Sequence, residues 1–207
     1  MTQHYFSESP GGELRPREVE VELAGAPRTV VTAGGVFSPD QLDRGTAILL
    51  RALPEADDLG PAGGAPLLDV GCGWGAIALD AALAQPEREI WAIDVNERSR
   101  ELTRMNAERL GLAHVRVASP DEVPDGLEFG EIRSNPPIRV GKDALHAILR
   151  QWLPRLQAGG VAHLVVAKHL GADSLQRWIA AEFADLVVDR PSRDKGFHII
   201  RASRAER

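Results

Sequence analysis

Short apolar runs and amphipathic stretches alternate along most of the chain. Runs of strand length are predicted at residues 19–23, 28–32, 67–70, 89–94, 115–118, 129–134, 161–167, 186–189 and 197–202. Segments with helical periodicity are predicted at residues 38–53, 75–84, 97–110, 142–156 and 174–182. This order favours an α/β fold, with a seven-stranded, mostly parallel sheet and helices on both faces. Only a short link joins the last two strands, so we expect them to be antiparallel neighbours.

The N-terminal part of the pattern predicts a β-hairpin. Residues 19–23 alternate apolar and acidic side chains, and residues 28–32 follow after a turn that contains glycine and proline. Ser38-Pro39 then has the residue types of a helix start, with serine as the cap and proline at the first helical position. We therefore expect residues 1–33 to form a tail and hairpin extension, and residues 34–207 to form one α/β domain.

Composition restricts the location of the protein. Its single cysteine, Cys72, cannot form an internal disulfide, which favours a reducing compartment. The polar start contains no apolar stretch of signal-peptide length, and the longest apolar runs are too short to span a bilayer. We expect a cytoplasmic protein without a membrane partner. Residues 54–66, rich in proline, glycine and alanine, are expected to be a linker.

Charge is unevenly distributed. The net charge is −6, but residues 139–207 contain 12 Lys+Arg and 7 Asp+Glu, a net charge of +5, which leaves −11 for residues 1–138. The asymmetry can be chance on a solvated surface, or it can be one basic surface that meets a phosphate backbone. Arg139, Lys142 and Lys168 lie at or near the expected C-terminal ends of strands, the ligand face of a parallel sheet, and are candidate substrate contacts.

The most specific local signal is a glycine-rich turn. Gly71, Gly73 and Gly75 follow a strand directly and precede a helix. Glycine permits a sharp turn and a close ligand approach, and the helix start presents free N–H groups. Asp94 ends the next strand, 19 residues after Gly75, where a carboxylate can accept both hydroxyls of a ribose. Asp69 would repel a pyrophosphate, but it suits a nucleoside ligand that carries an amino group and no phosphate.

This pattern, Asp-x-Gly-x-Gly-x-Gly with an acid closing the second strand, resembles motif I and its partner in class I methyltransferases, which have a Rossmann-like fold. The resemblance implies S-adenosylmethionine as the cofactor, with Asp69 and the three glycines near its methionine part and Asp94 at its ribose. It also implies contacts with the adenine from the region of Val95, Asn96 and Ser119.

A second signal is the segment Ser134-Asn135-Pro136-Pro137-Ile138, which follows a strand. Two prolines end the strand and stiffen the loop, so the preceding carbonyl groups are held in place. The side-chain oxygen of Asn135 and the carbonyl of Pro136 can then accept two hydrogen bonds from one –NH2 group and direct its lone pair toward a methyl donor. Taken alone, the segment is equally consistent with a plain turn.

The segment resembles the Asn-Pro-Pro-aromatic motif of amino-methyltransferases, which act on exocyclic nitrogens of adenine or guanine or on protein glutamine. The resemblance makes Asn135, Pro136, Pro137 and Ile138 the candidate catalytic residues. Ile138 replaces the aromatic residue that would stack on a base and can form only an apolar wall. Phe37 and Phe197 can supply the stacking instead, or they can belong to the core.

Residues 19–203 as a whole are similar to the methyltransferase small group, which includes bacterial enzymes that methylate the N2 amine of a guanine in 16S ribosomal RNA. The likeness is carried by Gly35-Val36-Phe37-Ser38, by Leu42-Asp43-x-Gly45-Thr46 and by Gly196-Phe197-His198-Ile199-Ile200-Arg201-Ala202. The chain looks like the single-domain members, which lack a second, degenerate copy of the domain. The resemblance implies that Phe37, Asp43 and Thr46 lie near the methionine end of the cofactor, although Asp43 and Thr46 are equally consistent with a helix surface. It also implies that Asn135 belongs to the cofactor site, and that ribosomal RNA or the small ribosomal subunit is the partner.

Three other functions stay open. Methylation of protein glutamine or DNA adenine would favour an aromatic residue at position 138. A non-catalytic S-adenosylmethionine-binding module is disfavoured by the intact Asn135 and Pro136. An NAD-dependent dehydrogenase is disfavoured by Asp69 and by the lack of an evident catalytic Tyr-Lys or His pair. The six histidines have no paired spacing of the metal-ligand type, so we expect no metal.

Overall fold

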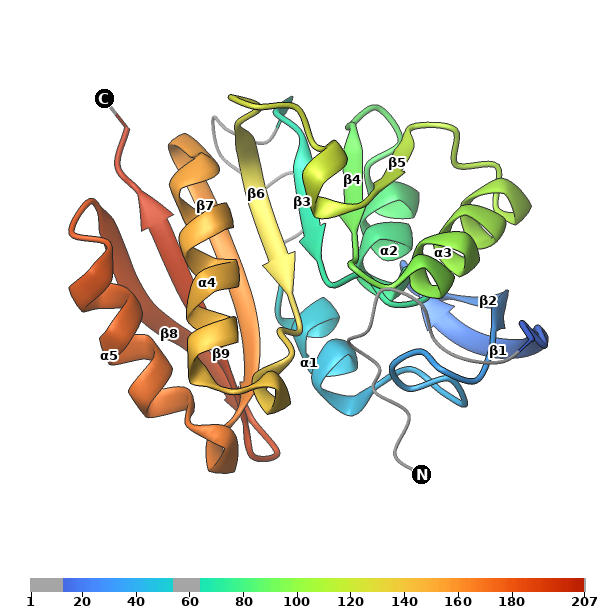
Figure 1. Cartoon of the computed structure of the whole chain (residues 1–207), viewed down its shortest axis with the longest axis horizontal. Coiled ribbons are helices and arrows are strands. Elements are labelled where there is room, and N and C mark those ends of the chain that lie inside the picture. The colour runs from blue at the N-terminus through green and yellow to red at the C-terminus, as the bar shows by residue number, and fades with distance from the viewer. Residues whose placement is uncertain (1–12, 54–63, 207) are drawn as a thin grey trace. The chain divides into compact units, whose positions relative to one another are not determined.

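The computed structural model describes residues 13–53 and 64–206, so most of the predicted linker and the start of the predicted tail lie outside the described residues. Within this part, seven strands form one sheet in the order β5-β4-β3-β6-β7-β9-β8, and β1 and β2 form a separate two-stranded sheet (Figure 1). The seven-stranded, mostly parallel sheet and the N-terminal hairpin are confirmed. None of the helices in the described ranges is long and apolar enough to cross a membrane.

The chain divides into two compact units. The first comprises Met1–Asp43 and Leu68–Asp125, and the second comprises Arg44–Leu67 and Gly126–Arg207. The elements assigned to the first unit, with β3 at its boundary, are β1 (Arg17–Leu23), β2 (Ala26–Thr32), β3 (Leu67–Val70), α2 (Ala76–Ala84), β4 (Ile90–Ile93), α3 (Glu97–Arg109), β5 (Val115–Ala118) and the 3-10 helix η3 (Pro120–Glu122).

Hydrogen bonds from a buried asparagine side chain join the N-terminal hairpin to the rest of the first unit. β1 and β2 are antiparallel, and Ala24 and Gly25 form the two-residue turn between them with φ angles of 48° and 70°. The Asn106 side chain, on α3, accepts the N–H of Val31 at 2.6 Å and donates to the carbonyl of Val31 at 2.9 Å. It also donates to the carbonyl of Trp74 at 3.0 Å, so one fully buried side chain joins β2 to the turn after β3.

The second unit contains the remaining strands, the other α-helices and several 3-10 helices. Its elements are α1 (Arg44–Ala52), β6 (Phe129–Ser134), the 3-10 helix η4 (Ile138–Val140), α4 (Lys142–Trp152), the 3-10 helix η5 (Leu153–Arg155), β7 (Leu156–Ala167), the 3-10 helix η6 (Lys168–Leu170), α5 (Ala172–Glu182), β8 (Leu186–Asp194) and β9 (Phe197–Arg204). β6 and β7 are parallel, whereas β9 is antiparallel to both β7 and β8, as the short final link predicts.

Helices α4 and α5 lie side by side in the second unit (Figure 1). The ring of His146 on α4 stacks on the ring of Trp178 on α5, with centroids 3.6 Å apart. Arg150 of α4 pairs with Glu182 of α5 at 2.6 Å beside this stack. α5 also packs against β8 and β9, while α1 packs against β7 and β9, so apolar faces of these helices cover the sheet.

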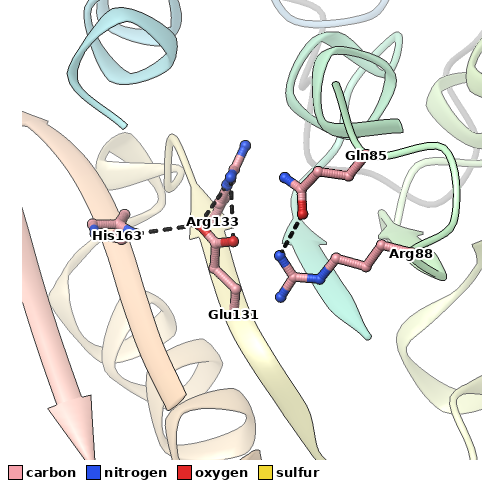
Figure 2. A network of polar contacts seen from close by, with 5 residues as sticks. All are labelled: Gln85, Arg88, Glu131, Arg133 and His163. Carbon is pink, nitrogen blue, oxygen red and sulfur yellow. Dashed lines mark hydrogen bonds and ion pairs between the residues drawn. The ribbon is translucent and has the colours of Figure 1, made fainter. Parts of the chain in front are cut away.

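A buried charged cluster occupies β6 and β7. Glu131 accepts hydrogen bonds from Arg133 at 2.7 Å and 3.2 Å, and the Nδ1 atom of His163 lies 3.4 Å from the same carboxylate (Figure 2). All three side chains are buried. Although burial by itself would raise the pKa of Glu131, the guanidinium and the imidazole hold that pKa well below its ordinary value. The charges can be buried because they neutralise one another.

Several predicted element boundaries are wrong, and β8 also continues to Asp194, beyond its predicted end at residue 189. Helix α1 begins at Arg44, not at Ser38, because Ser38 adopts a left-handed φ of 45° and its hydroxyl donates to the carbonyl of Gln41 at 2.9 Å. Likewise, α4 ends at Trp152 and β7 begins at Leu156, so the predicted helix to residue 156 stops early. Gly159 and Gly160 lie inside this strand.

Candidate functional site

The glycine turn links β3 to α2 in the first unit. Gly71, Gly73 and Gly75 all adopt positive φ angles, of 78°, 60° and 101°, which side chains disfavour. Around Gly71 and Gly73 a Cβ atom would meet nothing within 4 Å. At Gly75 it would lie 3.0 Å from side-chain atoms of Leu79 and Thr103, so this glycine is also required by packing.

Backbone and side-chain hydrogen bonds fix the shape of this turn. The N–H groups of Gly71 and Cys72 both donate to the carbonyl of Ile93, at 2.8 Å and 2.9 Å. The hydroxyl of Thr103 donates to the carbonyl of Gly73 at 3.0 Å, and the buried thiol of Cys72 lies 3.5 Å from the same hydroxyl. The turn is therefore preformed by the protein.

Asp94 lies directly against the glycine turn. One carboxylate oxygen accepts the N–H of Gly73 at 3.0 Å, and the other accepts the N–H of Asn96 at 2.9 Å. Burial raises the pKa of Asp94, although these two hydrogen bonds and nearby Arg100 act in the opposite direction. Each oxygen of a carboxylate can accept more than one hydrogen bond, so the group can still receive ribose hydroxyls.

Asp69 lies on β3 just before the glycine turn and contacts the helix that follows it. Its side chain is fully buried, and one oxygen accepts the N–H of Ala78, in the first turn of α2, at 3.0 Å. A carboxylate at this end of a helix is stabilised by the helix dipole. The contact gives Asp69 a structural role in holding α2 against β3, and its predicted part in cofactor binding stays a prediction.

The side chains predicted to contact the adenine differ in exposure and in their hydrogen bonds within the protein. Val95 is 45% exposed, which is unusual for valine and leaves it accessible to a ligand. Asn96 is buried, where its side chain caps α3 by accepting the N–H of Ser99 and donates to the carbonyl of Gly35. Ser119 caps η3 in a capping box with Glu122. Of these three side chains only Val95 is exposed, and contacts with the adenine stay a prediction.

Together, these features fit S-adenosylmethionine. The three glycines of the preformed turn have positive φ angles and no Cβ atoms, and the carboxylate of Asp94 next to them has remaining acceptor capacity. The exposed Val95 and Phe37, which is 48% exposed, add apolar surface in the same unit. A nucleoside with an amino acid tail requires such a combination of hydroxyl acceptor, open backbone and apolar surface.

The Asn-Pro-Pro segment follows β6 in the second unit, where α1 fixes its first residue. The side-chain nitrogen of Asn135 donates to the hydroxyl of Thr46 at 3.0 Å. Thr46 is itself buried on α1. Because nitrogen and oxygen are on different sides of a planar amide, this bond turns the amide oxygen of Asn135 away from Thr46. The oxygen is the atom that the predicted amine clamp uses.

The two prolines form a tight turn. The N–H of Ile138 donates to the carbonyl of Pro136 at 2.8 Å, and Pro137 has φ −74° and ψ 71°, the angles of an inverse γ-turn. The sequence did not indicate that Pro136 accepts an internal hydrogen bond. Because a carbonyl oxygen has two lone pairs, Pro136 retains capacity for one substrate N–H, and the internal bond fixes its direction.

Of the predicted substrate contacts, Lys168 and Phe197 are neighbours, because Ala167 pairs with Phe197 across β7 and β9. Lys142 and Lys168 are exposed at the starts of α4 and η6, and the half-buried Phe197 begins β9. The side chain of Arg139 lies outside the described residues. In the part of the chain that the structure describes, no group of three or more His, Cys, Asp or Glu could hold a metal ion.

One contact was missed by sequence reasoning. Thr46 was expected near the cofactor, yet its described contact is with Asn135, 89 positions later in the chain. No short-range pattern predicts a pair so distant in sequence. The only available signal was that both residues fall in segments that resemble the same family.

Comparison with known proteins identifies a matching family and related sequences. Residues 27–201 match the methyltransferase small domain family. The chain is 35% identical to the uncharacterized protein YbxB of Bacillus subtilis (strain 168), over 99% of this chain and 100% of that protein. It is 36% identical to ribosomal RNA small subunit methyltransferase C of Pseudomonas syringae pv. syringae, over 74% of this chain and 46% of that enzyme.

A solved structure shows the same architecture. The 16S rRNA N2 methyltransferase RsmC of T. thermophilus, in complex with AdoMet and guanosine, superposes with a TM-score of 0.78 and 25% identity. The superposition covers 93% of this chain and 51% of that enzyme. The chain thus spans about half the length of the ribosomal RNA methyltransferases that it matches.

Proposed function

The chain belongs to the methyltransferase small domain family, whose cofactor is S-adenosylmethionine, and from this premise we propose that it methylates the exocyclic N2 amine of a guanine in 16S ribosomal RNA. The observation that carries the proposal is the hydrogen bond from Asn135 to Thr46, which orients the amide oxygen for an amine. The turn at Pro136 supplies the second acceptor.

The residues of the Asn-Pro-Pro segment position an amine rather than activate it. The oxygen of Asn135 and the carbonyl of Pro136 each accept one N–H of an –NH2 group, so the nitrogen lone pair has a single direction. The amine keeps both protons until its nitrogen is alkylated, so the segment needs acceptors and no strong base. S-adenosylmethionine, when bound, supplies the electrophilic methyl group.

The proposal of guanine as the target base rests on the relatives. The ribosomal RNA methyltransferases similar to this chain act on the small subunit, and the RsmC structure holds guanosine. Ile138 lacks the ring that would stack on a base, and it is half-buried on η4. The base would lie against an aliphatic wall there. We therefore also propose that RNA is the partner and that the protein acts in the cytoplasm.

The first experiment is transfer of radiolabelled methyl from S-adenosylmethionine into cell extract, followed by nuclease or protease digestion. Label released by RNase and recovered in N2-methylguanosine of 16S rRNA would support the proposal. Label that resists nuclease and is released by protease would replace the RNA substrate with a protein. Absence of transfer to any macromolecule would leave a module that only binds S-adenosylmethionine.

Asn135→Ala separates the clamp from cofactor binding. The variant should lose most methyl transfer while its dissociation constant for S-adenosylmethionine stays close to that of the wild type. Isothermal titration measures the second quantity without activity. If transfer persisted near the wild-type rate, Asn135 would not be part of the clamp.

A further inference from the structure

Four basic side chains gather at one end of the second unit, around His198. Lys168 is on η6, Arg190 and Arg193 are on β8, and Lys195 is in the turn between β8 and β9. We call these four residues the basic tip. Positive charges in such proximity repel one another, so their gathering is more readily explained by an anionic partner than by stability.

The backbone of the basic tip is rigid. Lys195 and Gly196 form a two-residue turn with φ angles of 45° and 86°, and Asp194 pairs with Phe197 across it. The N–H of Lys168 donates to the carbonyl of Gly196 at 2.8 Å, which joins the start of η6 to this turn. Lys168 and Lys195 are therefore presented together on fixed backbone.

The four side chains of the basic tip differ in exposure: one is largely buried and three are exposed. The Arg190 side chain is 10% exposed, and it pairs with Asp173 at 2.6 Å. Lys168, Arg193 and Lys195 are exposed, and Arg193 pairs with His198 in the ladder between β8 and β9. The basic tip therefore combines one largely buried, paired positive charge with three exposed ones.

Acidic groups compensate only part of this charge. Asp173 faces Arg190, and Asp194 lies 3.9 Å from Arg51 of α1. The remaining cations of the basic tip thus outnumber the carboxylates near them. In agreement, burial first and then Arg190 hold the pKa of His198 below its ordinary value, with Arg193 and Lys168 adding to the effect.

Two buried nitrogen atoms at the basic tip also have no hydrogen-bond partner among the described residues. They are the Nε atom of Arg190 and the Nδ1 atom of His198. Buried polar atoms are usually paired, with protein or with water. Because both atoms are buried, Arg190 and His198 form the support of the surface, and an anion would contact the exposed cations.

The basic tip lies at the same end of the sheet as the Asn-Pro-Pro segment within the second unit. β6 and β7 are parallel and paired, with Ser134 opposite Leu164. Asn135 follows the C-terminal end of β6, and Lys168 follows the C-terminal end of β7. In open parallel sheets, ligands bind beyond these ends.

We propose that the basic tip binds the phosphodiester backbone of the RNA whose base is presented to Asn135. This inference rests on the proposed function and adds the surface that holds the substrate. Lys168, Arg193 and Lys195 contact phosphate oxygens, while Arg190 and His198 form their support. Because such contacts do not read sequence, the basic tip contributes affinity and position, and the Asn-Pro-Pro segment selects the amine.

The test is binding of labelled, in vitro transcribed 16S rRNA at a series of KCl concentrations. Arg193→Gln/Lys195→Gln should weaken binding roughly tenfold or more near 0.1 M salt, and should lower the slope of log affinity against log salt by about 1.4–1.8, the value for two lost phosphate contacts. The charge-preserving Arg193→Lys/Lys195→Arg should retain most affinity. Arg104→Gln, an exposed arginine of α3, should behave as the wild type.

Three results distinguish the two proposals. If the double glutamine variant keeps the wild-type affinity and salt slope while the wild type methylates 16S rRNA, the basic tip is not the RNA surface and the proposed function stands. If affinity falls only in the glutamine variant, at an unchanged unfolding temperature, the surface is supported. If the wild type binds no RNA and labels protein, both proposals are overturned.

Discussion

The side-chain nitrogen of Asn135 is 3.0 Å from the hydroxyl oxygen of Thr46, and this hydrogen bond joins the loop after β6 to helix α1. An asparagine side chain can present either its nitrogen or its oxygen in a given direction. In the structure the nitrogen faces the Thr46 hydroxyl, so the oxygen faces away from it. Thr46 is thus a positioning residue for the proposed amine clamp.

Removal of the Thr46 hydroxyl should slow methyl transfer. Thr46→Val keeps the shape of the side chain but removes the acceptor, at a cost of about 1 kcal/mol, which corresponds to a fall in kcat of roughly fivefold. Steady-state kinetics with 16S rRNA measure it. Thr46→Ser keeps the hydroxyl and should restore most of kcat. Equal rates in the valine and serine variants would show that packing, rather than the hydrogen bond, matters at this position.

Asp94 should contribute strongly to cofactor affinity. Asp94→Ala removes the carboxylate beside Gly73 and should weaken S-adenosylmethionine binding by about 1.5–3 kcal/mol, more than roughly tenfold in the dissociation constant. Isothermal titration gives this value directly. Glu101→Ala, which removes an exposed carboxylate from α3 of the same unit, is the matched control. A titration of Asp94→Ala indistinguishable from the control would exclude Asp94 from the site.

The three glycines of the turn should not be equally sensitive to substitution. Gly73→Ala introduces only a side chain at positive φ, which costs about 1–2 kcal/mol. Gly75→Ala carries the same strain and also places its Cβ 3.0 Å from Leu79 and Thr103, which adds about 1–3 kcal/mol of overpacking. Urea unfolding followed by tryptophan fluorescence should rank Gly75→Ala as the less stable variant; the reverse order would contradict the steric argument.

The buried carboxylate in β6 should make stability depend on pH. Because the pKa of Glu131 is lowered in the folded protein from its ordinary value of 4.5, its stabilising contribution is complete above that value. The contribution is lost as the pH falls below 4.5, because the unfolded chain then binds a proton that the folded protein does not. Urea midpoints measured from about pH 3 to about pH 7 give the slope, to which exposed carboxylates also contribute.

Substitution isolates the contribution of this carboxylate. Glu131→Leu alone leaves Arg133 buried without its carboxylate and should lower the free energy of unfolding by about 3–5 kcal/mol. Glu131→Leu/Arg133→Val removes both charges and should restore much of that loss. Its acid slope should be smaller than that of the wild type. An unchanged slope in the double variant would assign the acid sensitivity to other carboxylates.

The elements that could be predicted are those with local signals. Alternation of apolar runs and amphipathic stretches identified the strands and helices, and the glycine turn between β3 and α2 was evident from spacing alone. The start of α1 could not be located in this way. Ser38-Pro39 suits a helix start and a turn equally, and the choice was made by long-range contacts, such as the bond from Trp74 to the carbonyl of Ser38.

Burial of charge was equally hidden. Glu131-Ile132-Arg133 alternates in the way expected of a half-exposed strand, yet all of β6 is buried. Opposite charges two positions apart in a strand lie on the same face, where they can pair. Whether such a pair is solvated or buried depends on the neighbouring strand, and here β7 brings His163 beside Glu131. The sequence of β6 alone therefore could not predict that this pair is buried.

Asn106 has a consequence for the solubility of the hairpin. An outer strand of a sheet presents unpaired N–H and C=O groups that can recruit a strand from another molecule. At Val31, one amide side chain occupies both groups, as the backbone of a neighbouring strand would. Helix α3 therefore closes this position of β2 against intermolecular strand pairing without adding a third strand. An aspartate could not replace Asn106 there, because it would present a second acceptor to the carbonyl of Val31.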